Sequence, residues 1–186
     1  MNTFLYYIIG ASGAGKDSLI SFARHNIFDG ANVAFAHRYI TRDADSGSEN
    51  HISLSPREFS NRLAKGCFVM NWSSHGLDYG IGTEVLEWQN QGLSVVINGS
   101  RQYLPEAVKK FPDLKPILID VDINILEQRL TSRGRESKDE IAKRLQRAQD
   151  FSEKVQHPHL KRVSNNGSIE DAGKKLISLL TAENAL

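Results

Sequence analysis

One eight-residue segment near the start of the chain constrains the fold more than any other feature. Residues 10–17 read Gly-Ala-Ser-Gly-Ala-Gly-Lys-Asp, which fits the spacing G-x-x-x-x-G-K. The segment follows a continuous apolar run at residues 4–9 and precedes residues 17–25, whose apolar side chains recur at helical spacing. A short, wholly apolar run is typical of a parallel strand that is covered on both faces. We therefore expect a buried strand, a glycine-rich turn and a helix.

A turn of this kind binds phosphate for physical reasons. Glycines allow backbone conformations that other residues avoid, so that successive N–H groups and the helix N-terminus can surround an anion. Lys16 adds a mobile positive charge. The residues expected to bind the phosphates of a nucleotide are Gly10, Ala11, Ser12, Gly13, Ala14, Gly15, Lys16, Asp17 and Ser18.

Asp17 stands where this motif usually has the Ser or Thr that ligates Mg²⁺. A carboxylate at this position can hold the metal directly or through water, and it also suits the N-terminus of a helix. We therefore expect Asp17 to be the metal ligand. The alternative is that Asp17 only caps the helix, and that Ser18 or water serves the metal.

The rest of the chain alternates between strand and helix patterns. Strands are expected at residues 33–36, 67–72, 93–97, 117–121 and 160–163, and a helix at 105–110. Ser55, Asp122, Ser137 and Ser168 each precede a helical pattern as N-caps, with Glu58 and Glu140 closing capping boxes and Gly66 ending the first of these helices. This alternation predicts an α/β fold with a mainly parallel sheet flanked by helices. Residues 38–82 break the alternation and are expected to be an insert.

Composition excludes several classes of protein. The chain has 186 residues, enough for about one domain. The net charge of +1 argues against a protein that coats nucleic acid or binds membranes through a basic surface. The single cysteine, Cys67, excludes an intrachain disulfide framework. No apolar run approaches the roughly 20 residues that span a bilayer. We expect a cytoplasmic protein whose partner is a small molecule.

Several segments, which together with the phosphate loop span nearly the whole chain, resemble the guanylate kinases. Residues 129–136 and 141–145 are similar to the lid of those enzymes, residues 68–76 with Tyr79-Gly80 to their acceptor-binding segment, and Ile40-Thr41-Arg42 to their T-T-R motif. The resemblance implies a P-loop NTPase fold of the nucleoside-monophosphate-kinase type. It implies a single kinase domain over residues 1–186, with an acceptor-binding insert at about 38–82 and a lid at about 130–147.

This resemblance also implies roles for individual residues. Lys16, Arg133 and Arg144 would act on the transferring phosphoryl group, with Arg129 assisting, and Asn166 would lie near the adenine of ATP. Arg42 and Tyr79 would hold an acceptor phosphate. Arg147 matches the pattern less well and is expected to be a solvated charge.

Several positions depart from the guanylate kinase pattern. Met70 stands where those enzymes have the Glu that reads the guanine edge, and Asp45 stands where they have a second phosphate-binding Arg. Their G-x-D-Y motif is missing near residues 50–53. A site that has lost its hydrogen-bonding groups for a base binds that base poorly. These differences argue that GMP is not the acceptor.

A neighbouring family fits better. Residues 37–42, Gly47, residues 49–51 and residues 96–101 closely resemble the ribose 1,5-bisphosphate phosphokinases of phosphonate catabolism (PhnN), which also carry Gly-Lys-Asp in the phosphate loop. The resemblance implies ATP and Mg²⁺ as cofactors, ribose 1,5-bisphosphate as acceptor, and ADP and 5-phosphoribosyl 1-diphosphate as products. Arg38 and Arg101 would then bind the second phosphate of the acceptor, and Asn98 the sugar hydroxyls.

Three alternatives remain at this point. The chain could be a guanylate-kinase-like nucleoside monophosphate kinase, or a non-catalytic binding module of the same fold. It could also be a small sugar kinase that phosphorylates a hydroxyl, which would need a carboxylate base such as Asp45 or Glu49.

Overall fold

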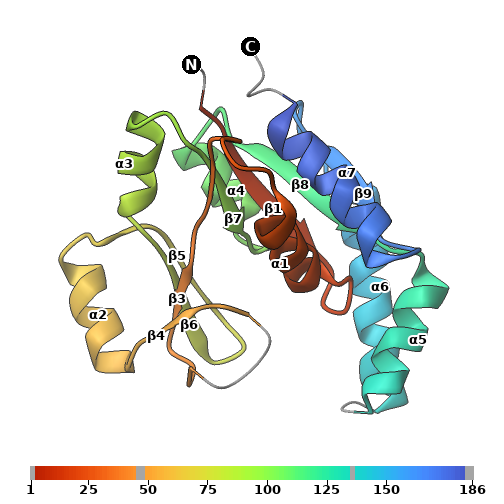
Figure 1. Cartoon of the computed structure of the whole chain (residues 1–186). Helices are drawn as coiled ribbons and strands as arrows, with labels where there is room; N and C mark the ends of the chain where they lie inside the picture. Colours follow the sequence, from red (N-terminus) through yellow and green to blue (C-terminus); the bar gives the residue numbers. More distant parts are fainter. Residues whose placement is uncertain (1–2, 45–48, 135–136, 183–186) are drawn as a thin grey trace.

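A parallel sheet of five strands forms the centre of the protein (Figure 1). The computed structural model describes residues 3–44, 49–134 and 137–182. In the order in which they pair, the strands are β2 (Val33–Phe35), β7 (Ser94–Asn98), β1 (Leu5–Gly10), β8 (Lys115–Asp120) and β9 (Lys161–Ser164), and every neighbouring pair is parallel. The expected α/β fold with a mainly parallel sheet is confirmed.

Strand β1 is apolar throughout because both of its faces are covered. Tyr6 and Ile8 pack with side chains of α1 (Lys16–Asn26) and α7 (Ile169–Thr181). Leu5, Tyr7 and Ile9 belong to a second core on the opposite face. That core includes side chains from α3 (Glu84–Asn90) and α4 (Leu104–Lys110), and α6 (Lys138–Lys154) packs against it. The position of β1 between two cores places its carboxyl end, and the loop that follows, at the middle of the molecule.

A smaller sheet occupies the segment expected to be an insert. Its strand order is β4 (Ile52–Ser53), β3 (Arg38–Ile40), β6 (Leu77–Gly82) and β5 (Phe68–Ser74), with α2 (Pro56–Ala64) connecting β4 to β5. Strands β5 and β6 form a hairpin whose two turn residues, His75 and Gly76, both have positive φ, as a tight hairpin turn requires. The small sheet and the pair formed by α5 (Ile123–Arg133) and α6 lie on opposite sides of the loop between β1 and α1 (Figure 1).

Most helix starts follow the capping signals in the sequence. The Asp122, Ser137 and Ser168 side chains each accept a hydrogen bond from a backbone N–H in the first turn of the following helix, and Glu140 closes the capping box at Ser137. Ser55 caps α2 in the same way, but the Glu58 side chain pairs with Arg62 at 2.5 Å. The expectation that Glu58 closes a capping box with Ser55 is therefore wrong. Among the described helices, none is long and apolar enough to cross a membrane.

The contact between α1 and α7 leads to a prediction about stability. Gly173 of α7 lies against Phe22 of α1, and a Cβ at this position would lie only 2.2 Å from a carbon of the Phe22 ring. Alanine favours a helix over glycine by about 1 kcal/mol, but overpacking of a tight contact costs about 1–3 kcal/mol. We expect Gly173→Ala to lower the melting temperature by about 2–4 °C, which corresponds to a net loss of about 1 kcal/mol.

The matched control is Gly167→Ala, because a Cβ at Gly167 would have no heavy atom within 4 Å. Thermal unfolding followed by circular dichroism checks both variants. A Gly173→Ala protein that melts at or above the wild-type temperature would contradict the packing described for α1 and α7.

Candidate active site

A cleft of about 360 Å³ lies at the carboxyl ends of β1 and β7, and we call it the central cleft. Parallel sheets bind ligands at this edge, where loops and helix N-termini converge. Three parts of the chain line the central cleft: the phosphate loop, the small sheet with the turn after β7, and the α5–α6 pair. The lining residues are Gly10, Ala11, Ser12, Gly13, Gly15, Lys16, Asp17, Ser18, Arg38, Trp72, Ser74, His75, Tyr79, Gly99, Ser100, Arg101, Gln102, Arg133 and Arg147.

The phosphate loop has the backbone that its glycines predict. Gly13 and Gly15 have φ values of 95° and 81°, in the left-handed region where side chains are unfavourable. Helix α1 begins directly afterwards at Lys16, so its free N–H groups lie beside the loop. This arrangement of loop and helix N-terminus can bind phosphate oxygens.

Asn165 holds this loop from behind. Its Nδ2 donates a hydrogen bond of 2.7 Å to the carbonyl oxygen of Ala14, and a Cβ at Gly15 would lie 2.5 Å from the same nitrogen. Asn166, which was expected near the adenine, accepts a hydrogen bond from the backbone N–H of Asp122 through its Oδ1. Asn165 is therefore the residue of this pair that supports the phosphate loop.

Lys16, Asp17 and Asn98 form a hydrogen-bonded group at one wall of the central cleft. The Lys16 ammonium donates to Asp17 Oδ1 at 3.2 Å and, at close range, to Asn98 Oδ1. Asn98 Nδ2 donates to Asp17 Oδ1 at 2.9 Å. Asn98 is 6% exposed and lies behind the cleft surface, which argues against the expected contact between Asn98 and sugar hydroxyls.

Burial and charge shift the pKa values of this group. Burial lowers the pKa of Lys16, although Asp17 and Glu49 act in the opposite direction. Burial alone would raise the pKa of Asp17, but Lys16, Arg38 and the hydrogen bonds from Asn98 and Lys16 bring it below its ordinary value. Asp17 is therefore a carboxylate at neutral pH, as a ligand for Mg²⁺ must be.

Glu49 lies at the centre of the charges on the acceptor side. It accepts two hydrogen bonds from Arg38, of which the one from Nε measures 2.5 Å, and a third from Arg42 Nη2 at 3.4 Å. Arg42 also contacts His51 Nδ1 at 3.2 Å. Among the described residues, the buried Nε of Arg42 has no hydrogen-bond partner. Arg38 lines the central cleft, whereas Arg42 does not.

Aromatic side chains form the wall below Arg38. Trp72 stacks on Tyr79 with parallel rings 5.4 Å apart, and Tyr103 stacks on the same Trp72 at 5.4 Å. The Arg38 guanidinium lies over the Tyr79 ring at 5.1 Å, in a cation–π contact. Met70 is fully buried in the core on the same strand as Trp72, so this position offers no polar group to a bound base.

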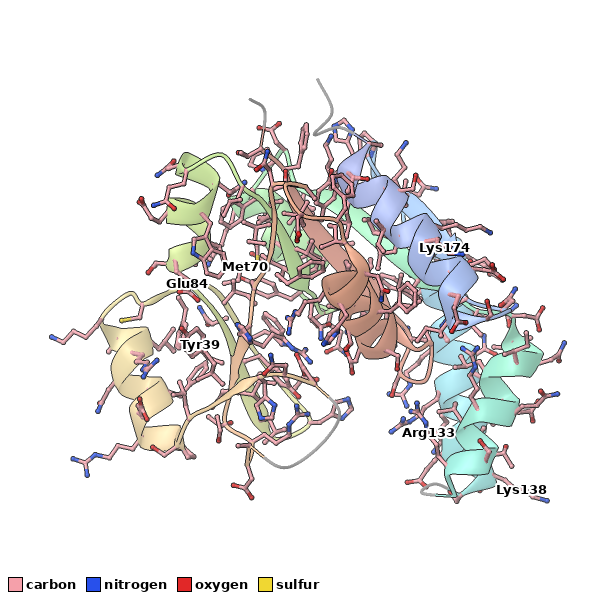
Figure 2. The ribbon with its side chains drawn as sticks, viewed as in Figure 1. Tyr39, Met70, Glu84, Arg133, Lys138 and Lys174 are labelled. Atoms are coloured by element: carbon pink, nitrogen blue, oxygen red, sulfur yellow. The ribbon has the colours of Figure 1, made fainter. Side chains whose placement is uncertain are left out.

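Arginines from the α5–α6 pair and from the turn after β7 surround the opposite side. Arg133 projects from the last turn of α5 toward the side on which the phosphate loop lies (Figure 2). Arg144 Nη1 donates to Ser12 Oγ at 3.1 Å. Arg101 lies over the Phe151 ring at 5.3 Å, and burial together with the nearby charge of Arg147 lowers its pKa. Arg147, expected to be a solvated charge, is exposed and also lines the cleft.

The structure brings many of the predicted site residues together, but not all of them. Arg129 does not line the central cleft and instead binds the carbonyl oxygen of Asn165 through Nη2, at 2.9 Å. The predicted positions Asp45 and Gly47 lie outside the described residues. Sequence reasoning considered Glu49 only as a base and missed its contacts with arginines. The available signal was a glutamate in the same short segment as Arg38, Arg42 and His51, but Asp43 and Asp45 in that segment gave no reason to single it out.

Comparison with known proteins agrees with this geometry. The family model for guanylate kinase matches residues 3–183. A guanylate kinase from Anaplasma phagocytophilum has the same fold, with a TM-score of 0.70 over 99% of this chain and 87% of that one, at 16% sequence identity.

Curated relatives are much more similar in sequence. A protein of Psychromonas ingrahamii is 53% identical over 95% of this chain and 89% of its own length. Proteins of Thiobacillus denitrificans and Yersinia pestis are 45% and 43% identical, over 97% and 98% of this chain and 94% and 93% of their own lengths. All three are named ribose 1,5-bisphosphate phosphokinase PhnN. The chain therefore belongs to the guanylate kinase family and, within it, to the ribose 1,5-bisphosphate phosphokinases named PhnN.

Proposed function

We propose that this protein transfers the γ-phosphoryl group of ATP to ribose 1,5-bisphosphate, giving ADP and 5-phosphoribosyl 1-diphosphate. The observation that carries the proposal is the central cleft, in which a phosphate loop faces arginines from two other parts of the chain. The names of the relatives supply the identity of the acceptor. The reaction forms one P–O bond to a phosphate oxygen of the acceptor and breaks the bond between the γ-phosphorus and the bridging oxygen to the β-phosphate, which leaves with ADP.

This reaction needs positioning and charge neutralisation more than proton transfer. The attacking oxygen belongs to a phosphate that is already anionic at neutral pH, so no general base is required. Phosphoryl transfer is catalysed mainly by alignment and by groups that offset the charge on the transferring phosphoryl. The central cleft is rich in such groups, because Lys16, Arg38, Arg101, Arg133 and Arg147 all line it.

The donor side would be formed by the phosphate loop. Its backbone N–H groups and Lys16 would bind the phosphates of ATP, and Arg133 would approach the transferring phosphoryl group from α5. Arg144 already reaches Ser12 of the loop and would close over the same phosphates. Closure of the α5–α6 pair would exclude water, which would otherwise compete with the acceptor.

Asp17 fits the role of magnesium ligand. Its side chain is 41% exposed, it lines the central cleft, and both of its hydrogen bonds go to Oδ1. Mg²⁺ commonly binds one or two carboxylates and takes its other ligands from water and substrate phosphates. Asp17 would hold the ion beside the loop, and Mg²⁺ when bound would supply positive charge that partly neutralises the phosphates of ATP.

The acceptor side would hold the two phosphates of the sugar. Arg38, which the resemblance pairs with Arg101, lies over Tyr79, and these two residues would bind one phosphate. The buried Nε of Arg42, which has no hydrogen-bond partner in the described part of the chain, would be available to the same phosphate. Arg101 would bind the second phosphate, because its charge and that of Arg147 repel each other until an anion lies between them. Trp72, which lines the cleft, would offer apolar surface to the furanose ring.

The acceptor is tested most directly by a panel of substrates. With MgATP we expect ADP release with ribose 1,5-bisphosphate, and rates at least about tenfold lower with ribose 5-phosphate, GMP and AMP, because a missing phosphate or a base without partners leaves the arginines unsatisfied. A coupled ADP assay measures the rates, and mass spectrometry identifies the products.

The same panel separates the alternatives. Faster turnover with GMP would make the protein a nucleoside monophosphate kinase. It would also contradict the argument that Met70 leaves the site without a polar group for a guanine base. ATP binding without turnover of any acceptor would identify a binding module.

The metal ligand is tested by two neighbouring substitutions. Asp17→Asn should raise the Mg²⁺ concentration needed for half-maximal rate by about tenfold or more, because a neutral amide binds Mg²⁺ less well than a carboxylate. Ser18→Ala should leave it within about twofold of wild type. The opposite pattern would assign the metal to Ser18. Magnesium titrations at fixed, saturating ATP provide the measurement.

A further inference from the structure

An unbroken series of hydrogen bonds joins the acceptor side of the central cleft to its donor side. It begins at Arg38, which donates to both carboxylate oxygens of Glu49. Glu49 Oε1 also accepts from Asn98 Nδ2, at 3.0 Å. Asn98 in turn accepts the hydrogen bond of Lys16. Two residues, Glu49 and Asn98, therefore connect the acceptor-side arginine with the lysine of the phosphate loop.

The Asn98 amide is held in one orientation by the charges around it. Its two N–H groups serve two carboxylates, Asp17 and Glu49, and its oxygen serves the Lys16 ammonium. Rotating the amide by 180° would place the oxygen against both carboxylates and the N–H groups against the ammonium. Both the Nδ2 and the Oδ1 of Asn98 therefore have partners, and the side chain is buried, so the amide is fixed in place.

Glu49 likewise fixes the orientation of the Arg38 side chain. Both side chains are largely buried, at 10% and 12% exposed. A bidentate pair between guanidinium and carboxylate fixes the plane of the guanidinium as well as its position. Arg38 is thereby kept over the Tyr79 ring, with its remaining N–H groups available at the cleft.

We infer that Glu49 is a positioning residue that sets both phosphate-binding sides of the cleft, Arg38 by direct contact and Lys16 through Asn98. This inference rests on the proposed function, because it concerns the alignment of the donor and acceptor phosphates. It also excludes Glu49 as the base of a sugar kinase, since its oxygens already accept hydrogen bonds from Arg38, Arg42 and Asn98.

The inference predicts a particular separation of kinetic parameters. Glu49→Gln removes a negative charge from a group of three cations and two carboxylates, so anions are attracted to the cleft at least as strongly as before. Alignment of Arg38 and Lys16 is lost, however, and alignment matters for the transition state rather than for binding. We expect kcat to fall by about tenfold or more, which is the scale of one charge-assisted hydrogen bond. The KM for ribose 1,5-bisphosphate should stay unchanged or decrease.

The link through Asn98 is tested by a double-mutant cycle. Asn98→Ala alone should also lower kcat, because Lys16 loses its anchor. If both residues act in one series of contacts, the double variant should have a kcat close to that of the worse single variant, rather than the product of the two losses.

The matched control is Glu58→Gln, which makes the same change of charge on the small-sheet segment at an exposed pair with Arg62. It should leave kcat and KM at wild-type values. If Glu49→Gln does not fold, Glu49→Asp replaces it, because the shorter side chain keeps the charge but cannot span Arg38 and Asn98 together. Melting temperatures identify any loss that is due to unfolding.

The outcomes are distinct. An unchanged kcat for Glu49→Gln, an increase confined to KM, or fully multiplicative losses in the double variant would each overturn the inference while leaving the proposed function in place. Wild-type protein that does not turn over ribose 1,5-bisphosphate would instead overturn the proposed function, and the inference with it.

Discussion

Repulsion among positive side chains in a small volume is the constraint around which the cleft is organised. Lys16, Arg38 and Arg42 are balanced by two carboxylates, those of Asp17 and Glu49, and the buried Asn98 amide joins Lys16 to both carboxylates. On the opposite side, Arg101 and Arg147 face each other closely enough that charge repulsion contributes to the lowered pKa of Arg101. Grouping positive charges in this way destabilises a folded chain unless they are neutralised. Ligands with several phosphate groups would supply the negative charge that neutralises them.

The scaffold keeps these charges in place through rigid elements. Strand β1 is buried between two apolar cores and ends at the phosphate loop, which is why the loop has a fixed position relative to the sheet. Asn165, at the end of β9, holds the same loop from behind. The small sheet brings Arg38 and Tyr79 to the cleft on the neighbouring strands β3 and β6. In this antiparallel pairing Arg38 lies opposite Ile81, and Tyr79 lies opposite Ile40. Each charged group therefore depends on packing elsewhere in the chain.

Local sequence signals predicted the parallel sheet, most of the helices and the phosphate loop, because these features depend on short-range patterns. Strands β3, β4 and β6 and helix α3 were not predicted. The three strands are short or, in β6, interrupted by glycines, and their pairing depends on partners far away in the chain. For the site, residue type indicated Lys16, Arg38 and Arg133. It did not indicate that Asn98 is buried behind the cleft, or that Asn165 rather than Asn166 supports the loop, since both depend on tertiary packing.

The central claim is that the acceptor atom is a phosphate oxygen, and phosphorus NMR of the product tests it most directly. The wild-type protein would be incubated with MgATP and ribose 1,5-bisphosphate, with ADP and residual ATP resolved as references. The account predicts a new pair of phosphorus doublets with mutual coupling, from a diphosphate on the sugar, and retention of one uncoupled monoester. A new uncoupled monoester signal, with no new coupled pair beyond those of ADP, would show that a hydroxyl group is the acceptor and would contradict the account.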